Sequence, residues 1–337
     1  MATTKPLITV LGSLNMDLVS YVPHHPLPGE TLTSTRFNVS PGGKGANQAV
    51  ACAKLSRSQP PSTTTTTSSS STPSSAATTD PTSTAQIRMI GAVGQDTYGT
   101  QLLSNLSSHG VDVSGVLAPS GTKTGLAIIL VDEPTGQNRI VLSPEANHSL
   151  EATQFSSRAS LGAPLPSLLI MQLEIPLPTV LASLRSAREA SVPVLLNPAP
   201  AQELPASAYE GLAHLVVNET EAAILGGVSE ADLDASPGLE AVGKTFLGRG
   251  VQNVIITLGG RGVFYMSASG AKGLVPAEKA KVVDTTAAGD TFVGMYALDV
   301  VSGNFNIEEA VKKANRAAAK TVERLGAQDS IPWRDEL

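Results

Sequence analysis

The strongest constraint on the fold is a repeated alternation of short apolar, β-prone runs with helical segments. The apolar runs lie at residues 7–14, 87–93, 168–173, 192–197, 214–218 and 254–257. Helical patterns follow at residues 46–55, 98–109, 178–190 and, near the end, in the alanine-rich stretch 307–325. Strands separated by helices usually pair in parallel. The sequence therefore predicts an α/β fold with a mostly parallel central sheet and helices on both faces.

Two regions depart from this rhythm and predict a small second sheet. Residues 18–40 contain three prolines followed by a short alternating run at 31–39. Residues 124–131 and 139–143 alternate on either side of Asp132-Glu-Pro-Thr-Gly136, which is the pattern of a β-hairpin. We expect these segments, within 18–40 and 124–143, to pair with one another beside the main sheet. Both belong to a single domain over residues 1–337.

A third region has no capacity for a packed core. Of the 25 residues from 60 to 84, 22 are serine, threonine or proline. Because such a segment has too little apolar surface to offset the entropy cost of ordering, it predicts a disordered insertion over about residues 57–85.

The composition excludes several classes of protein. Lys and Arg number 23 against 29 Asp and Glu, a net charge of −6, so no overall basic surface for nucleic acid is present. Cys52 is the one cysteine, which excludes an intramolecular disulfide. No apolar run reaches membrane-spanning length, and the N-terminus lacks a signal-peptide pattern. We expect a cytoplasmic protein that binds neither nucleic acid nor a membrane. The sequence is also compatible with its presence in the nucleus.

The stretch from Asp284 to Asp290 carries the clearest chemical signal. Ala287, Ala288 and Gly289 are small and precede an apolar helical run at 291–301, so a ligand can approach the backbone closely. The free N–H groups of a first helical turn, together with the helix dipole, favour an anion. Asp290 then lies beside the anion site as a candidate base. The alternative interpretation is an ordinary aspartate helix cap after a glycine turn.

Other polar residues follow the predicted strands. Asn15 and Asp17 come after the first apolar run, and a glycine-rich loop from Gly42 to Asn47 opens the next helix. In open α/β sheets, ligands bind at the carboxyl ends of the strands. These groups can supply a base, a backbone cradle for an anion, carboxylates for Mg²⁺ and partners for hydroxyls, as phosphoryl transfer requires. A turn-forming Asn and Asp pair is the competing interpretation at the first site.

Several motifs in this order resemble the ribokinase-like (PfkB) carbohydrate kinases. Gly42-Gly-Lys-Gly-Ala-Asn47 is similar to the N-terminal signature of that family, and Asp284 to Asp290 is similar to its C-terminal one. Further similar segments are Asn218-x-x-Glu221, Met171-Gln-Leu-Glu174, Asn197-Pro-Ala-Pro200 and Gly326-Ala-Gln-x-Ser330. The resemblance runs from residue 7 to 333, interrupted at 57–84.

The resemblance implies a Rossmann-like kinase fold with a β-sheet lid, and phosphorylation of D-ribose at O5 by ATP. It assigns Asp290 as base, with an anion hole formed by Ala287, Ala288 and Gly289. The implied sugar site is Asn15, Asp17, Gly42, Gly43, Lys44, Asn47, Glu174 and Asp290. The implied nucleotide site is Thr257, Leu258, Gly259, Gly260, Arg261, Gly262, Gly289 and Asn315, with Asn218 and Glu221 near Mg²⁺ and phosphate. The implied K⁺ site is Asp284, Thr286, Thr321, Arg324, Gly326 and Ser330. The family further implies a homodimer formed through the lid.

Two departures and several alternatives accompany this assignment. Residues 143–147 read Ser-Pro-Glu-Ala-Asn, where the family usually has a glycine before Ala-Asn, and Val217 replaces a common proline. A PfkB-type kinase for another sugar or a nucleoside fits the same motifs, as does a catalytically inactive sugar sensor. Few aromatic residues, 4% of the chain, disfavour a nucleoside, whose base would need an apolar or aromatic wall.

Overall fold

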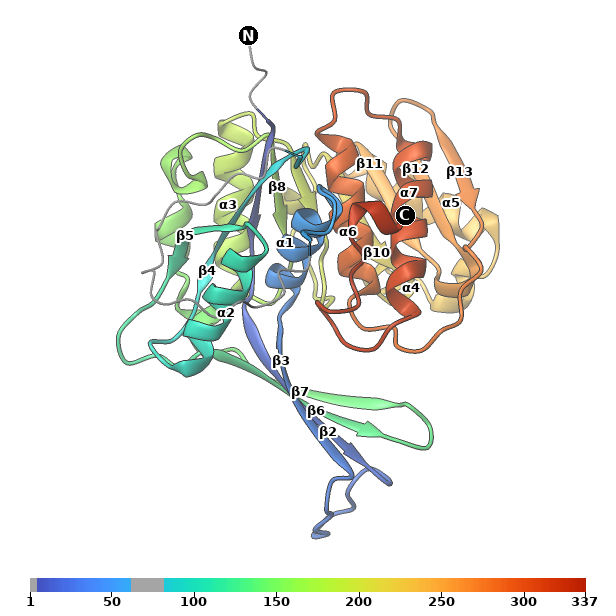
Figure 1. Ribbon diagram of the computed structural model, residues 1–337. Coiled ribbons are helices and arrows are strands. Elements are labelled where there is room, and N and C mark those ends of the chain that lie inside the picture. The colour runs from blue at the N-terminus through green and yellow to red at the C-terminus, as the bar shows by residue number, and fades with distance from the viewer. Residues whose placement is uncertain (1–4, 62–81) are drawn as a thin grey trace.

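The computed structural model describes residues 5–61 and 82–337 (Figure 1). Within these residues nine strands form the main sheet, in the order β13-β12-β11-β10-β9-β8-β1-β4-β5. Their bounds are β1 Leu7–Leu11, β4 Gln86–Ala92, β5 Asp112–Leu117, β8 Leu168–Met171, β9 Val194–Leu196, β10 His214–Asn218, β11 Asn253–Thr257, β12 Val263–Ser267 and β13 Lys272–Val275. The strands from β5 to β11 pair in parallel, whereas β12 and β13 are antiparallel. The predicted α/β fold is confirmed.

Helices cover both faces of this sheet and enclose two hydrophobic cores. One core packs the sheet against α1 Lys44–Leu55, α2 Thr97–Ser108, α6 Ala288–Val300 and α7 Ile307–Val322. The other packs it against α3 Leu177–Glu189, α4 Glu219–Gly226 and α5 Ser236–Gly248. Short 3₁₀ helices occupy Glu145–Ser149, Ala152–Phe155, Arg158–Leu161, Ala206–Ala208, Glu230–Leu233, Gly259–Arg261 and Arg334–Glu336. In the part of the chain that the structure describes, no helix has both the length and the apolar character to cross a membrane.

A second sheet projects from the main body (Figure 1). Among the described residues it has four strands, β2 Asn15–Val22, β3 Arg36–Gly42, β6 Gly125–Asp132 and β7 Asn138–Ser143, in the order β3-β2-β6-β7. The central pair β2 and β6 is parallel, and each outer pair is antiparallel. We call this sheet the lid. The prediction placed a strand at residues 31–39, but β3 begins only at Arg36 and extends to Gly42.

The predicted first strand was too long. β1 ends at Leu11, although the Gly12 N–H still donates to the Ile90 carbonyl oxygen at 3.1 Å. Gly12 packs closely against α1, where a Cβ at Gly12 would lie 2.9 Å from Gly45 Cα. The Leu14 N–H donates to Asn147 Oδ1 (2.9 Å) instead of to a neighbouring strand. Asn15 and Asp17 therefore begin lid strand β2 and do not end a strand of the main sheet.

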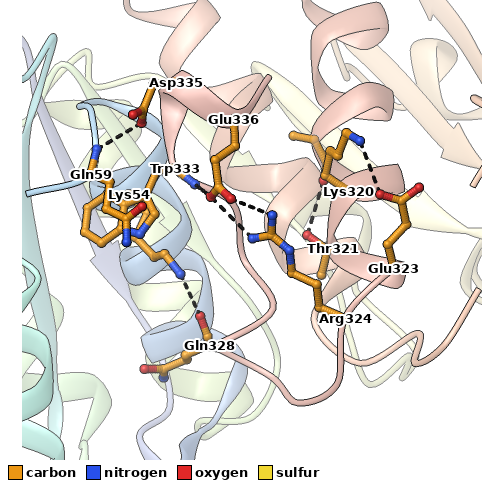
Figure 2. A network of polar contacts seen from close by, with 11 residues as sticks. Lys54, Gln59, Lys320, Thr321, Glu323, Arg324, Gln328, Trp333, Asp335 and Glu336 are labelled. Atoms are coloured by element: carbon orange, nitrogen blue, oxygen red, sulfur yellow. Dashed lines mark hydrogen bonds and ion pairs between the residues drawn. The ribbon is translucent and has the colours of Figure 1, made fainter. Parts of the chain in front are cut away.

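The predicted insertion was too wide at both ends. Ala85 is buried, and the Arg334 guanidinium donates to the carbonyl oxygens of Ser56 (2.9 Å) and Thr82 (3.2 Å). The Gln59 N–H donates to Asp335 Oδ1 at 2.9 Å (Figure 2). The flanks of the insertion are thus packed on the C-terminal segment. The remainder of the predicted insertion, residues 62–81, lies outside the described residues.

Candidate active site

Two adjoining cavities open at the carboxyl ends of the main strands. The first has a volume of about 360 Å³ and lies between the sheet and the lid. The second has a volume of about 510 Å³ and lies beside α7 and β11. Both are lined by Thr257, Thr285 and Gly289, so the N-terminus of α6 separates one from the other. We call them the lid cavity and the outer cavity.

The predicted sugar and nucleotide residues divide between these cavities. The lid cavity is lined by Asn15, Asp17, Gly43, Lys44, Asn47, Glu174, Asn218, Glu221, Ala287 and Asp290. The outer cavity is lined by Gly259, Gly260, Gly262, Ala288 and Asn315. Three predicted residues line neither cavity: Gly42, Leu258 and Arg261.

Each of these three has a structural explanation. A Cβ at Gly42 would overlap the Asp17 carboxylate, so Gly42 makes room for that side chain. Leu258 is buried in the core. The Arg261 guanidinium pairs with Glu219 and donates to the Leu233 carbonyl oxygen at 3.1 Å, so it points to α4 and away from the cavities.

Asp290 lies in the first turn of α6 with its carboxylate held on both oxygens. Asn47 Nδ2 donates to Oδ2 at 3.0 Å, and Gln48 Nε2 donates to Oδ1 at 2.9 Å. The side chain is buried, yet Asp290 contributes to the lining of the lid cavity. A carboxylate in this setting can accept a proton from a hydroxyl group in the cavity.

The turn before Asp290 brings main-chain N–H groups to the start of α6, and that of Ala288 makes only a long bond to the Thr285 carbonyl oxygen (3.3 Å). Ala287 has left-handed backbone angles (φ 60°, ψ 6°), which non-glycine residues seldom adopt. The following Gly289 faces open space, since a Cβ there would meet no atom within 4 Å. N–H groups in a first helical turn lack acceptors within the helix, and the helix dipole adds positive potential. The turn can therefore bind an anion where the two cavities meet.

Charged groups crowd the lid cavity. Burial, followed by the charges of Glu174 and Asp290, raises the pKa of Asp17 to about 7. Burial opposes the charge on Lys44, but the carboxylates of Asp290, Glu174 and Glu221 outweigh it and raise the pKa of this ammonium. Lys44 is therefore the cationic counterpart of this carboxylate group.

Three further hydrogen bonds fix polar side chains at the lid base. Glu174 Oε2 accepts from Ser13 Oγ (2.6 Å) and from the Lys44 N–H (3.1 Å). Asn147 Nδ2 donates to Asn15 Oδ1 at 2.8 Å, which orients Asn15 in the cavity. Gly43 (φ 86°) permits this packing because a Cβ there would lie 2.7 Å from the Asn15 nitrogen.

Asn218 and Glu221 form a reciprocal cap at the start of α4. The Asn218 N–H donates to Glu221 Oε2 at 2.9 Å, and the Glu221 N–H donates to Asn218 Oδ1 at 2.8 Å. Burial raises the pKa of Glu221, although its bond from Asn218 and the charge of Lys44 act in the opposite direction. Over residues 5–61 and 82–337, no cluster of three or more His, Cys, Asp or Glu residues could hold a metal ion.

The predicted K⁺ residues surround two adjoining loops. Asp284 Oδ1 accepts from the Thr286 N–H (2.9 Å) and Oγ1 (2.7 Å). Thr321 Oγ1 donates to Thr291 Oγ1 at 2.9 Å, and Ser330 Oγ donates to the Ala327 carbonyl oxygen at 2.7 Å. Arg324 pairs with Glu336 at 2.5 Å (Figure 2). The side chains of Thr321, Arg324 and Ser330 thus have protein partners, and the Thr321 carbonyl oxygen accepts from the Arg324 N–H at 3.1 Å. The main-chain carbonyls of Arg324 and Ser330 are the candidate ligands.

Four polar residues near Asp290 have no role predicted from the sequence, and one of them, Asn197, lines the lid cavity. Gln48, Gln172, Asn197 and Gln328 form hydrogen bonds that lead to Asp290. All four belong to or adjoin the motifs that carry the family resemblance. Their position beside these motifs was the one sequence feature that could have identified them as part of the site.

The chain is similar to known proteins over nearly its whole length. Residues 5–334 match the sequence pattern described as pfkB family carbohydrate kinase. The chain is 41% identical to a ribokinase of Schizosaccharomyces pombe over 96% of this chain and 94% of the relative. A crystal structure of ribokinase from Thermotoga maritima shares 36% identity and a TM-score of 0.78, covering 98% of this chain and 97% of that one. The structure of Arabidopsis thaliana ribokinase complexed with ribose and ATP has a TM-score of 0.81 at 25% identity, covering 98% and 97%. The chain therefore belongs to the pfkB family of carbohydrate kinases.

Proposed function

We propose that this enzyme transfers the γ-phosphoryl group of ATP to O5 of D-ribose, giving D-ribose 5-phosphate and ADP. The observation that carries the proposal is the position of Asp290, a buried carboxylate at the helix N-terminus that separates two cavities. The similarity to ribokinases over nearly the whole chain supports ribose as the acceptor. The ring of polar side chains in the lid cavity suits a small polyhydroxylated sugar.

In this mechanism the sugar occupies the lid cavity and the nucleotide the outer cavity. Asp290 accepts the proton of the O5 hydroxyl as its oxygen attacks the γ-phosphorus, and the bond between the γ-phosphorus and the leaving oxygen of ADP breaks. The N–H groups of the turn at 287–289 stabilise the charge on the transferring group. Lys44 balances the carboxylates that line the cavity, because its ammonium is stabilised by all three neighbours.

Two cations complete the proposed site. The cap at Asn218 and Glu221 uses Glu221 Oε2, so Oε1 could accept from water on Mg²⁺. Mg²⁺ commonly binds one or two carboxylates together with substrate phosphates, which fits a protein site with few acidic ligands. Mg²⁺ would supply charge neutralisation for the phosphates. K⁺ would be held by the Asp284 carboxylate, Thr286 and loop carbonyls near residues 321–330.

We further propose a homodimer formed through the lid. Val39, Leu18, Ile128 and Val141 are partners across the four lid strands and therefore share one face. Three of them are exposed, Val39 to 40%, Ile128 to 42% and Val141 to 63%. An apolar row of this kind on an outer sheet face suits a partner surface. Sedimentation of wild type and of Val141→Glu tests this, since the variant should be monomeric if the lid forms the interface.

A coupled assay of ADP release across pentoses, hexoses and nucleosides tests the activity. We expect D-ribose to give the highest kcat/KM. If 2-deoxyribose, fructose or a nucleoside gives a higher kcat/KM, that compound is the substrate in place of ribose. If no compound in the panel is turned over, the protein is better explained as a sugar sensor.

A further inference from the structure

The carboxylate of Asp290 is contacted by two side-chain amides that are themselves held by other amides. A carboxylate only accepts hydrogen bonds, so Asn47 and Gln48 must present their NH₂ groups to it. Their carbonyl oxygens therefore face away from Asp290 and require donors of their own. Both donors are present, and both are glutamines.

The first series of bonds reaches Asp290 through Asn47. Gln328 Nε2 donates to Asn47 Oδ1 at 3.1 Å, and Asn105 Nδ2 donates to Gln328 Oε1 at 2.6 Å. Every donor in the series Asn105, Gln328, Asn47 points toward Asp290, an arrangement in which each bond polarises the next. The series joins α2, the loop after α7, α1 and α6.

The second series reaches Asp290 through Gln48. Gln172 Nε2 donates to Gln48 Oε1 at 2.6 Å, and Gln48 Nε2 contacts Asn197 Oδ1 (3.0 Å) as well as Asp290. Both Gln48 and Gln172 are fully buried. This series is anchored at the end of β8, whereas the first depends on a loop.

We propose that Gln328 is a positioning residue for phosphoryl transfer: by fixing the amide of Asn47, it sets the orientation of the Asp290 carboxylate. Gln328 lines neither of the two cavities within the described residues, so it acts through Asn47 and not on a ligand. It is itself held at two points, because Lys54 Nζ donates to its main-chain carbonyl oxygen at 3.1 Å (Figure 2) and Asn105 to its side chain. The inference rests on the proposed function insofar as Asp290 is the base.

Loss of the Gln328 donor would free the Asn47 amide to rotate. Its oxygen could then face the Asp290 carboxylate, where two acceptors repel, and the carboxylate would lose one of its two holding bonds. Turnover should fall more than nucleotide binding, because the outer cavity does not include these residues.

Gln328→Met tests this, since methionine keeps a similar length and lacks the donor. We expect a decrease in kcat of about tenfold, the loss associated with one buried hydrogen bond, with KM for ATP nearly unchanged. The decisive measurement is a double-mutant cycle with Asn47→Ala. If Gln328 acts through Asn47, adding Gln328→Met to Asn47→Ala should change kcat by less than about twofold. If the losses of kcat caused by the two substitutions multiply in the double variant, the proposal is overturned.

Two further variants guard against a trivial outcome. Gln101→Met, an exposed glutamine on α2, should leave kcat unchanged. If Gln328→Met does not fold, Asn105→Ala removes the preceding donor, and its smaller loss of kcat should likewise disappear in the Asn47→Ala background. A loss that persists there would count against the series.

A crystal structure of Gln328→Met, or of Asn105→Ala, separates this inference from the proposed function. The Asn47 amide and the Asp290 carboxylate should be rotated or disordered in it. Unchanged orientations would overturn the inference, whichever sugar is the substrate. Absence of ribose phosphorylation by the wild type would instead overturn the proposed function, and the cycle would then use the best acceptor in the sugar panel.

Discussion

The Asp284 carboxylate and the main chain of Gly326 are joined by a hydrogen bond of 2.9 Å from the Gly326 N–H to Oδ2. The two residues are far apart in sequence, one before the anion-binding turn and one after the last long helix. The neighbouring Val283 N–H also donates to the Val322 carbonyl oxygen at 2.7 Å. An ion that orders one of these loops therefore also constrains Val283 and Asp284, which lead into the turn at 287–289.

We accordingly expect K⁺ to activate the enzyme through kcat and not through sugar affinity. At constant ionic strength, K⁺ should exceed Na⁺ and Li⁺, because a large, weakly hydrated ion is readily held by loop carbonyls. Asp284→Ala should remove this response while the protein remains folded by circular dichroism. Equal rates in K⁺, Na⁺ and a bulky organic cation would eliminate the cation site but leave the kinase assignment intact.

Asp290→Asn should abolish most turnover and leave sugar binding largely intact. Removal of a general base typically lowers the rate by about 10²–10⁴-fold. The substitution also places an NH₂ group near the Asn47 and Gln48 donors, which prevents full recovery of the wild-type geometry. Single-turnover kinetics with calorimetric sugar binding would check this. Asp299→Asn, on the same helix, is the control, and wild-type turnover by Asp290→Asn would remove Asp290 from the role of base.

Asp17 should make stability depend on pH. The pKa of its carboxyl is about 7 in the folded protein, against the ordinary value of 3.8 that applies to the unfolded chain. Between these two pH values the folded protein therefore binds more protons than the unfolded chain. Stability from this group is therefore highest at low pH and falls as pH rises through that window. At pH 8, Asp17→Asn should have a free energy of unfolding higher than that of wild type by on the order of 2–4 kcal/mol, and it should unfold at a higher temperature.

That difference should vanish at about pH 2, below both pKa values, where the wild-type carboxyl is protonated in both states. The exposed Glu203→Gln is the control and should follow wild type at every pH. The same Asp17→Asn substitution should raise KM for the sugar, since Asp17 lines the lid cavity. A variant no more stable than wild type at pH 8 would show that the buried charge carries no cost.

The sequence predicted those parts of the site that depend on local chemistry. Glycine loops and strand-end polar residues leave local patterns, and most of them line the two cavities. The bond between Gln328 and Asn47 spans 281 positions and leaves no such pattern. α5 was not predicted because Gly238 and Gly243 have low helix propensity, yet its buried Phe246 packs in the core and holds it.

The departure from the family pattern at residues 143–147 places a glutamate, Glu145, at a position with left-handed backbone angles. It adopts φ 47°, a left-handed conformation that glycine adopts readily and glutamate does not. The side chain is exposed, so nothing in the surroundings requires glutamate. Two residues later, Asn147 holds both Leu14 and Asn15. The segment that follows β7 thus has a backbone geometry typical of glycine, and Glu145 is strained in that geometry.

Glu145→Gly should therefore stabilise the protein. The relief of left-handed strain, about 1–2 kcal/mol, exceeds the added entropy of glycine in the unfolded chain, about 0.4–1 kcal/mol. Differential scanning calorimetry should show a rise in Tm of about 1–2 °C. The reverse control is Gly136→Ala, at φ 71° in the β6–β7 turn with open space around it, which should lower Tm. KM for the sugar should stay at the wild-type value, because the Asn147 bonds to Leu14 and Asn15 are preserved. A lower Tm for Glu145→Gly would mean that the glutamate side chain makes a stabilising contact that outweighs its backbone strain.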